Sequence, residues 1–368
     1  MSAHQPWTVF HAPYPLEENP TAASRLRPLR MRQAFEQIGY RVLDLTGTVR
    51  ERRARLAALR ERLNAGERPD FLYCENSTQP NLLATGTREG LRAPALDYRV
   101  MALMRRHRIP VGVFYRDAYW TVPGQDLGVY HRVANALQRL DLMGYRRNGV
   151  HFFLPSEPMH ALIGLGEGDS YSALPPAGEE GHVLDLPSSG EGLRLVYVGG
   201  LGQHYVLTDF VTALTATDGV SMDLVTREVQ WASAVRQDPR LADPRITPLH
   251  LGSKELLPVY ERAHIGLLTV EPSAYRDIAV PVKLFEYLSY GRPVIATAGT
   301  EAGRVIAANG AGWVVPYDAD EMRVLLEHLR ACPEEVRERA RLARAAAADN
   351  TWAERARTAA CRLTEGRA

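Results

Sequence analysis

The chain has 368 residues, of which 45% are hydrophobic and 24% charged, and its formal net charge is +1 at pH 7. This length allows two ordinary domains with separate cores, and the composition is typical of a globular protein. Positive and negative charges nearly cancel, and this balance gives no reason to expect a nucleic acid as partner. No window is apolar over the length of a membrane span, and residues 1–13 lack the basic and apolar regions of a secretion signal.

Strand and helix patterns alternate along the first half of the chain, which predicts a parallel α/β sheet. The expected strands cover residues 7–13, 41–45, 70–75, 109–117 and 151–156. The expected helices cover about 21–39, 49–63, 94–108 and 130–145. The helix at 49–63 contains six arginines, with Leu56, Leu59 and Leu63 on one face. We expect an ordinary surface helix there, and the alternative is a peripheral contact with an anionic inner membrane surface.

Residues 164–192 are rich in Gly, Pro, Ser and Glu, which indicates an interdomain linker. A second alternation follows, with strands expected at 193–200, 220–228, 245–252, 264–270, 293–297 and 312–318. We therefore expect two Rossmann-like domains whose parallel sheets face each other across a cleft. The predicted boundaries are a first domain at 1–175, a linker at 176–192, a second domain at 193–345, and a C-terminal helix at 346–368 that crosses back.

Cys74, Cys332 and Cys361 lie far apart and form no disulfide framework or metal-ligand spacing. They predict reduced thiols in a cytoplasmic protein, and no metal or cofactor is expected. The segment Asp318–Asp320 reads Asp-Ala-Asp and follows a predicted strand. We interpret it as a helix N-cap with first-turn acidity, and not as a metal site.

The stretch from Val280 to Thr297, VPVKLFEYLSYGRPVIAT, places a cation and a carboxylate in an otherwise apolar helix. Pro281 is expected at the first helical position, so the backbone N–H groups after it are unpaired and favour an anion, with Lys283 beside them. Glu286 lies one turn further on the same face, where a carboxylate can accept hydrogen bonds from the vicinal diol of a ribose. This layout predicts a nucleotide site. The alternative is a local ion pair between residues three apart.

Several segments then resemble one family. Residues 281–297, 193–214, 246–272, 310–329 and 350–356 are similar to nucleotide-sugar-dependent glycosyltransferases with the GT-B fold, of the group-1 (family-4-like) type. About half of the chain carries this resemblance, and the first half matches only in outline, at residues 25–42. It implies an acceptor-binding first domain and a second domain that binds the nucleotide-sugar donor.

The resemblance also implies roles for individual residues. Glu286 aligns with the glutamate that binds the donor ribose, and Lys283 with a position near the diphosphate. Gly199, Gly200 and Gly202 match the loop that lets a donor phosphate or the reacting sugar approach the backbone. His250, Leu251 and Gly252 fall where the family's backbone contacts the nucleobase. Arg227 is the candidate for a second diphosphate cation, and the alternative is a surface arginine beside Glu228.

The sequence departs from the family at two positions. Ile278 stands where an acidic residue is common, with Asp277 next to it. His204 and Tyr205 stand where a basic residue usually follows the glycine loop.

Candidates for the acceptor side lie in the first half. Asp117 follows a predicted strand and is a candidate general base, although it also fits a turn cap or a pair with Arg116. His11 is the rival base, or else a loop residue. Tyr119 and Trp120 are expected to stack on a sugar ring. Arg25, and Arg27 with it, would meet an anionic acceptor, or would simply form a solvated helix start.

The predicted function is transfer of a sugar from a UDP- or GDP-type donor to a hydroxyl acceptor without a metal. If Asp117 is a base, attack inverts the anomeric centre; the group-1 resemblance favours retention, in which the leaving phosphate takes the proton. The alternatives are a non-catalytic GT-B-like accessory subunit, a sugar-nucleotide epimerase, or an NADP enzyme suggested by the GGLGQH loop. The loop lacks the third glycine of the dinucleotide motif.

Overall fold

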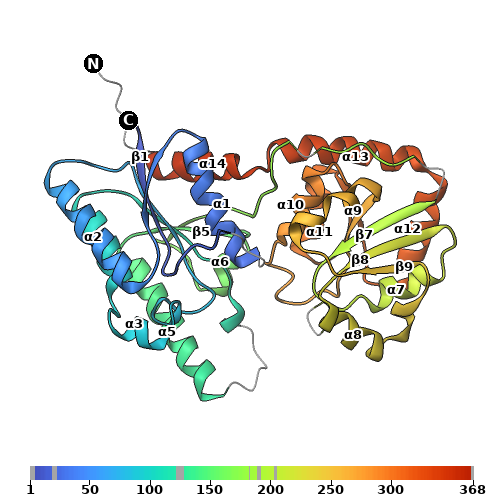
Figure 1. The fold of residues 1–368 in the computed structure, drawn as a ribbon, viewed down its shortest axis with the longest axis horizontal. Helices are drawn as coiled ribbons and strands as arrows, with labels where there is room; N and C mark the ends of the chain where they lie inside the picture. The colour runs from blue at the N-terminus through green and yellow to red at the C-terminus, as the bar shows by residue number, and fades with distance from the viewer. Residues whose placement is uncertain are drawn as a thin grey trace. The chain divides into compact units, whose positions relative to one another are not determined.

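The computed structural model describes residues 5–18, 23–121, 128–181, 183–188, 192–202 and 205–365. The chain divides into two compact units (Figure 1). Unit 1 comprises Met1–Pro175 and Trp352–Ala368, and unit 2 comprises Pro176–Thr351. Each unit holds one six-stranded parallel sheet with helices around it, so the predicted pair of Rossmann-like folds is confirmed.

Unit 1 has the strand order β2-β1-β3-β4-β5-β6. Its strands are β1 (Trp7–His11), β2 (Arg41–Leu45), β3 (Leu72–Glu75), β4 (Val111–Phe114), β5 (His151–Leu154) and β6 (Ser170–Ala173). Its helices are α1 (Ala23–Gln37), α2 (Val49–Asn64), α3 (Thr87–Leu91), α4 (Leu96–Arg106), α5 (Val129–Arg147), α6 (Met159–Leu162) and α14 (Trp352–Thr364), with 3₁₀ turns η1 (Asn81–Leu83) and η2 (Tyr119–Thr121). The C-terminal helix α14 packs beside α1, as Figure 1 shows.

Unit 2 has the strand order β12-β11-β10-β7-β8-β9. Its strands are β7 (Leu193–Val198), β8 (Val220–Val225), β9 (Ile246–Leu249), β10 (Ile265–Leu268), β11 (Val294–Thr297) and β12 (Gly312–Val315). Its helices are α7 (Thr208–Thr215), α8 (Glu228–Gln237), α9 (Leu257–Arg262), α10 (Val282–Ser289), α11 (Glu301–Asn309), α12 (Ala319–Ala331) and α13 (Pro333–Ala348), with 3₁₀ turns η4 (Pro239–Ala242) and η5 (Ser253–Glu255). Two apolar cores lie on opposite faces of the sheet, one under α7 and α12 and one under α9, α10 and α11.

The basic helix α2 has a capped N-terminus and a buried apolar face. Thr48 and Glu51 form a capping box at its start, which holds two of the otherwise unpaired N–H groups. Leu56, Leu59 and Leu63 are buried in unit 1, so the apolar stripe of this basic helix belongs to the core. The face that remains exposed is the arginine-rich one.

Three details differ from the sequence expectation. The strand β6 lies inside the stretch 164–192, which was expected to be irregular; its residues Ser170–Ala173 are only partly buried, so little apolar alternation marks it. The strand β4 ends at Phe114, three residues before the expected end at Asp117. Pro281 is the N-cap of α10, one position before the helix begins.

Among the described residues, no helix combines the length and apolar character that crossing a bilayer requires. The three cysteines are free: Cys74 is buried and Cys361 is exposed, with Cys332 intermediate.

Candidate active site

The strand order of unit 2 creates a switch point between β7 and β10, where successive connections leave in opposite directions. In open parallel sheets, ligands bind at such a point beyond the carboxyl ends of the strands. The glycine loop follows β7 directly, and the segment that leaves β10 leads into α10. The predicted donor residues of the second half therefore gather along one edge of one sheet.

Glu286 on α10 is held through both of its carboxylate oxygens. The hydroxyl of Tyr260 donates to Oε1 at 2.7 Å, and Nζ of Lys283 donates to Oε2 at 2.5 Å. The local ion pair that the sequence offered as an alternative is thus present in this structure. The two side chains of the pair are 27% and 23% exposed, so a ligand at this edge can reach both.

Tyr260 was not among the residues singled out in the sequence. It lies on α9, is fully buried, and stacks on Tyr290 with ring centroids 4.3 Å apart. Burial, reinforced by the nearby carboxylate of Glu286, raises the pKa of Tyr260 well above its ordinary value. The hydroxyl therefore stays protonated and remains a hydrogen-bond donor to Glu286.

The glycine loop is tied to the same helix. The backbone N–H of Val198 donates to the hydroxyl of Tyr287 at 2.9 Å, and Tyr287 adjoins Glu286. The N–H of Gly199 donates to the carbonyl of Val225 at 3.0 Å, which fixes the start of the loop against β8. A Cβ on Gly199 would lie 2.8 Å from the hydroxyl of Tyr197, so a side chain there would collide with the wall of the loop.

Gly200 and Gly202 continue this loop. The hydroxyl of Tyr197 donates to the carbonyl of Gly200 at 2.7 Å. Gly202 has φ +129°, a backbone conformation that favours glycine, and it lines a cavity of about 210 Å³ on the far side of the loop, between α7 and α8. His204 lies outside the described residues.

Arg276, which the sequence did not single out, lies beside this loop. Its guanidinium is 4.4 Å from the centre of the ring of Tyr205, and the Tyr205 ring is the nearest neighbour of a Cβ built on Gly200. A cation from the segment before α10 therefore reaches the region where the family's basic residue is missing. Sequence could not reveal this, because Arg276 and Tyr205 are brought together only by folding. The neighbouring Asp277 pairs with Arg304 at 2.7 Å.

The predicted base-binding residues follow β9. Nδ1 of His250 lies 2.9 Å from the carbonyl oxygen of Thr226, and because a carbonyl only accepts, Nδ1 carries the proton. Leu251 is partly buried against the core under α9 and α10, and the N–H of Gly252 donates to Glu255 at 2.8 Å. Arg227 is exposed at the N-cap of α8, one strand away.

Asp318 behaves as the sequence predicts for an N-cap. Its Oδ1 accepts hydrogen bonds from the N–H groups of Asp320 and Glu321, each at 3.0 Å. Its position at the start of α12 explains the Asp-Ala-Asp segment.

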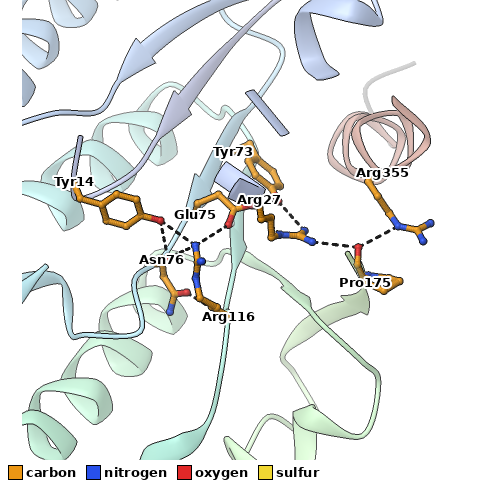
Figure 2. A network of polar contacts seen from close by, with 8 residues as sticks. All are labelled: Tyr14, Arg27, Tyr73, Glu75, Asn76, Arg116, Pro175 and Arg355. Carbon is orange, nitrogen blue, oxygen red and sulfur yellow. Dashed lines mark hydrogen bonds and ion pairs between the residues drawn. The ribbon is translucent and has the colours of Figure 1, made fainter. Parts of the chain in front are cut away.

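The candidates for the acceptor side belong to unit 1, whose strand order has its own switch point between β1 and β3. Tyr14, Asn76 and Arg116 meet there from the segments that follow β1, β3 and β4. Nη2 of Arg116 lies 3.0 Å from the hydroxyl of Tyr14 and 3.2 Å from the carbonyl oxygen of Asn76. Figure 2 shows Arg116 between Tyr14 and Asn76 on one side and Glu75 on the other.

Glu75, the last residue of β3, is the centre of this network and was not predicted. Its side chain is fully buried, and its oxygens lie 3.1 Å from Nε of Arg27 and 3.4 Å from Nη2 of Arg116. The hydroxyl of Tyr73 donates to it at 2.9 Å. The interpretation of Arg27 as part of a solvated helix start is therefore wrong, since only 4% of its side chain is exposed.

The same network reaches the junction between the units. Arg27 and Arg355 both donate to the carbonyl oxygen of Pro175, the last residue before the chain leaves unit 1 (Figure 2). Burial, together with the charge of Arg27, lowers the pKa of Arg355 to about 10. Arg25 lies outside this buried group: it is 37% exposed and pairs with Glu17 at 3.4 Å.

His11 is held away from the surface. Its Nε2 lies 2.8 Å from Asp97 on α4, Asp97 also pairs with Arg52 on α2, and the imidazole is only 2% exposed. The loop-residue alternative for His11 is therefore wrong, and the structure does not bring His11 to the exposed edge. These bonds lower the pKa of Asp97 despite its burial, with His11 as the leading stabilising partner.

Asp117 and Trp120 lie beyond the end of β4. Asp117 is 9% exposed, and Nε1 of Trp120 donates to the hydroxyl of Tyr115 at 3.0 Å, with Arg139 near its ring. Tyr119 opens η2, and its side chain lies outside the described part of the structure.

Comparison with known protein families gives a match in the second half of the chain. Residues 211–360 match a family model described as glycosyl transferase-like. The match includes Arg227, His250, Lys283 and Glu286. Among curated proteins, none matches the chain.

Solved structures resemble the chain over nearly its whole length. Sucrose-phosphate synthase from Thermosynechococcus elongatus is 12% identical with a TM-score of 0.64, covering 96% of this chain and 97% of its own. WaaG, a glycosyltransferase involved in lipopolysaccharide biosynthesis, is 14% identical with a TM-score of 0.61, covering 98% and 100%. AviGT4, a glycosyltransferase involved in avilamycin A biosynthesis, is 14% identical with a TM-score of 0.55, covering 98% and 99%.

At these identities the structural likeness establishes the fold, which is GT-B. The resemblance to group-1 glycosyltransferases is confirmed, and the family match on the second half supports the coarse class of glycosyltransferase.

Proposed function

We propose that the protein transfers a sugar from a nucleoside-diphosphate sugar, of UDP or GDP type, to a hydroxyl acceptor. The observation that carries this proposal is the arrangement at the switch point of unit 2. There a partly exposed carboxylate and ammonium lie on α10, and the start of the glycine loop is tied to the same helix. A ribose diol suits the carboxylate of Glu286, and a diphosphate suits Lys283 with the first N–H groups of α10.

The leaving diphosphate would be stabilised by Lys283, Arg227 and Arg276 together with the helix N-terminus. Three protein cations can do the electrostatic work that a divalent cation does elsewhere, so we propose a metal-independent reaction without a resident cofactor. The nucleobase would lie against His250, Leu251 and Gly252.

A thermal-shift screen with UDP, GDP, ADP, CMP and dTDP tests the donor assignment. We expect UDP or GDP to stabilise unit 2 most. A ligand at about 100 times its Kd adds about 2.7 kcal/mol, which is roughly 5–10 °C for a domain of this size. No shift with any of the five nucleotides would contradict the proposal and favour the non-catalytic accessory subunit.

For the acceptor side we propose unit 1, with Asp117 as the residue that meets the acceptor hydroxyl. Asp117 is preferred over His11 because His11 is buried and committed to Asp97. Trp120 and Tyr119 would contact the acceptor, and Arg25 would meet an anionic group on it.

The variant Asp117→Asn separates two mechanisms. We expect a retained anomeric centre and a loss that lies mainly in the acceptor KM, about tenfold, because the acceptor is held less well. NMR of the product and steady-state kinetics measure both quantities. A fall of about 10²–10⁴ in kcat with an inverted product would instead make Asp117 the general base.

We propose a cytoplasmic location, in keeping with free thiols and a nucleotide co-substrate. Any peripheral membrane contact through α2 would be electrostatic, since its leucines and Arg52 are buried in unit 1 and its other arginines lie outside the core.

A further inference from the structure

Both oxygens of the Glu286 carboxylate have hydrogen-bond partners within the protein. Tyr260 holds Oε1 and Lys283 holds Oε2. Under the proposed function, on which this inference rests, the same carboxylate must accept hydrogen bonds from a ribose. The two partners therefore need to be told apart.

Tyr260 belongs to the interior. It is fully buried, it stacks on Tyr290, and its ring also meets Tyr287 edge-on with centroids 6.0 Å apart. Its hydroxyl thus approaches Glu286 from within unit 2 and has no route to solvent. This contact holds the carboxylate in place.

Lys283 belongs to the solvent side. Its side chain is 27% exposed and stands in the first turn of α10, three residues before Glu286. Because Tyr260 fills the inner side, the ammonium covers the oxygen that a ligand arriving from solvent would reach first. A neutral diol must compete with this charged donor, and charge-assisted hydrogen bonds are about twice as strong as neutral ones.

A diphosphate changes this balance. It offers Lys283 a partner with more negative charge than one carboxylate, at the N-terminus of the same helix. When the ammonium turns to the phosphate, Oε2 of Glu286 is released while Tyr260 still holds Oε1. The ribose then finds an ionised and oriented acceptor.

We propose that the Lys283–Glu286 ion pair makes recognition of the ribose conditional on binding of the diphosphate, with Tyr260 as the positioning residue for the carboxylate. The site would thereby discriminate against nucleosides that lack phosphate. Such coupling is reciprocal, so an intact ribose also strengthens the diphosphate contact.

The test is the variant Lys283→Met, which keeps an unbranched side chain one atom shorter and removes its charge. Calorimetry measures the affinities for UDP, GDP and ADP. The affinity for the parent nucleoside (uridine, guanosine or adenosine) is then measured by letting it displace the nucleotide that binds most tightly. We expect the diphosphate to bind about 10–100 times more weakly, because a charge-assisted contact is lost. We expect the nucleoside to bind about 2–5 times more tightly, because one ion pair no longer competes.

The proposal predicts that the affinity for the diphosphate falls while the affinity for the nucleoside rises. A merely structural role of Lys283 would weaken the binding of both ligands. Lys283→Gln should behave like Lys283→Met, which excludes an apolar effect of the methionine. Arg337→Met removes an i,i+3 ion pair with Glu334 on α13 and should change neither affinity. Tyr260→Phe should bind the nucleoside diphosphate several-fold more weakly, because the carboxylate of Glu286 is no longer oriented toward the ribose. The 2′-deoxy or 3′-deoxy nucleotide should lose less affinity, because it has one ribose hydroxyl fewer for that carboxylate.

Failure of the proposal and failure of the proposed function give different results. If the wild-type protein binds no nucleotide, the donor site itself is wrong. The wild-type protein could instead bind a diphosphate while Lys283→Met weakens nucleoside binding as well, or nucleoside binding could be undetectable in both proteins. Either result overturns the coupling and leaves the donor site in place.

Discussion

Glu286→Ala should weaken nucleotide binding by roughly 30–150-fold while both units remain folded. The estimate follows from about 2–3 kcal/mol for hydrogen bonds between a ribose and an ionised carboxylate. The same change leaves the buried hydroxyl of Tyr260 without its acceptor, which costs unit 2 about 1–3 kcal/mol of stability. Isothermal titration calorimetry with the nucleotide that gives the largest thermal shift measures the affinity.

Two further variants sharpen this experiment. Glu286→Gln keeps the shape of the side chain and an oxygen for Tyr260 but loses the charge, so an intermediate affinity is expected. Glu338→Ala removes an exposed carboxylate of an i,i+3 pair on α13 and should leave the affinity unchanged. Full nucleotide affinity in Glu286→Ala would disprove the ribose assignment.

Glu75→Ala should destabilise unit 1 by about 3–5 kcal/mol, the usual cost of removing one partner of a buried ion pair. Glu75 is fully buried and is shared by Arg27 and Arg116, so its loss leaves two guanidinium groups without their common carboxylate (Figure 2). The hydroxyl of Tyr73 loses its acceptor as well. Because Arg27 also holds Pro175, the junction to unit 2 is expected to loosen with it.

Hydrogen exchange offers a measurement with an internal reference. Amides of β1, β3 and β4 should exchange faster in Glu75→Ala, whereas those of β7, β8 and β10 in unit 2 should keep their wild-type rates. Glu36→Ala, which removes the exposed partner of Arg32, is the matched control and should cost no more than about 1 kcal/mol. A loss below 1 kcal/mol in Glu75→Ala would mean that solvent or other groups compensate the two arginines.

The two switch points give the two units different characters. In unit 2 the side chains of Lys283 and Glu286 are partly exposed, which suits exchange with a ligand. In unit 1 the charges at the corresponding edge are largely neutralised within the protein, and Arg25 is more exposed than Arg27.

Local patterns in the sequence were sufficient to predict the fold and the helix that carries Lys283 and Glu286. Alternating strand and helix signals define a parallel α/β chain, and the three-residue spacing of Lys283 and Glu286 places both on one face of any helix that contains them. These are properties of neighbouring residues, so they can be read before folding. The edge strand β6 was missed because a half-exposed strand needs little apolar alternation.

Only the tertiary structure decided which distant residues meet. Glu286 and Tyr260 are 26 residues apart, Arg27 and Glu75 are 48 apart, and His11 and Asp97 are 86 apart. Such contacts depend on strand order and on the packing of helices across a sheet, which no local periodicity specifies. The sequence alone therefore placed Lys283 and Glu286 on one helix face and predicted a nucleotide site there. The structure determined that its carboxylate is held by a buried tyrosine, and that His11 is committed to Asp97, because both outcomes follow from side chains brought together by the sheet.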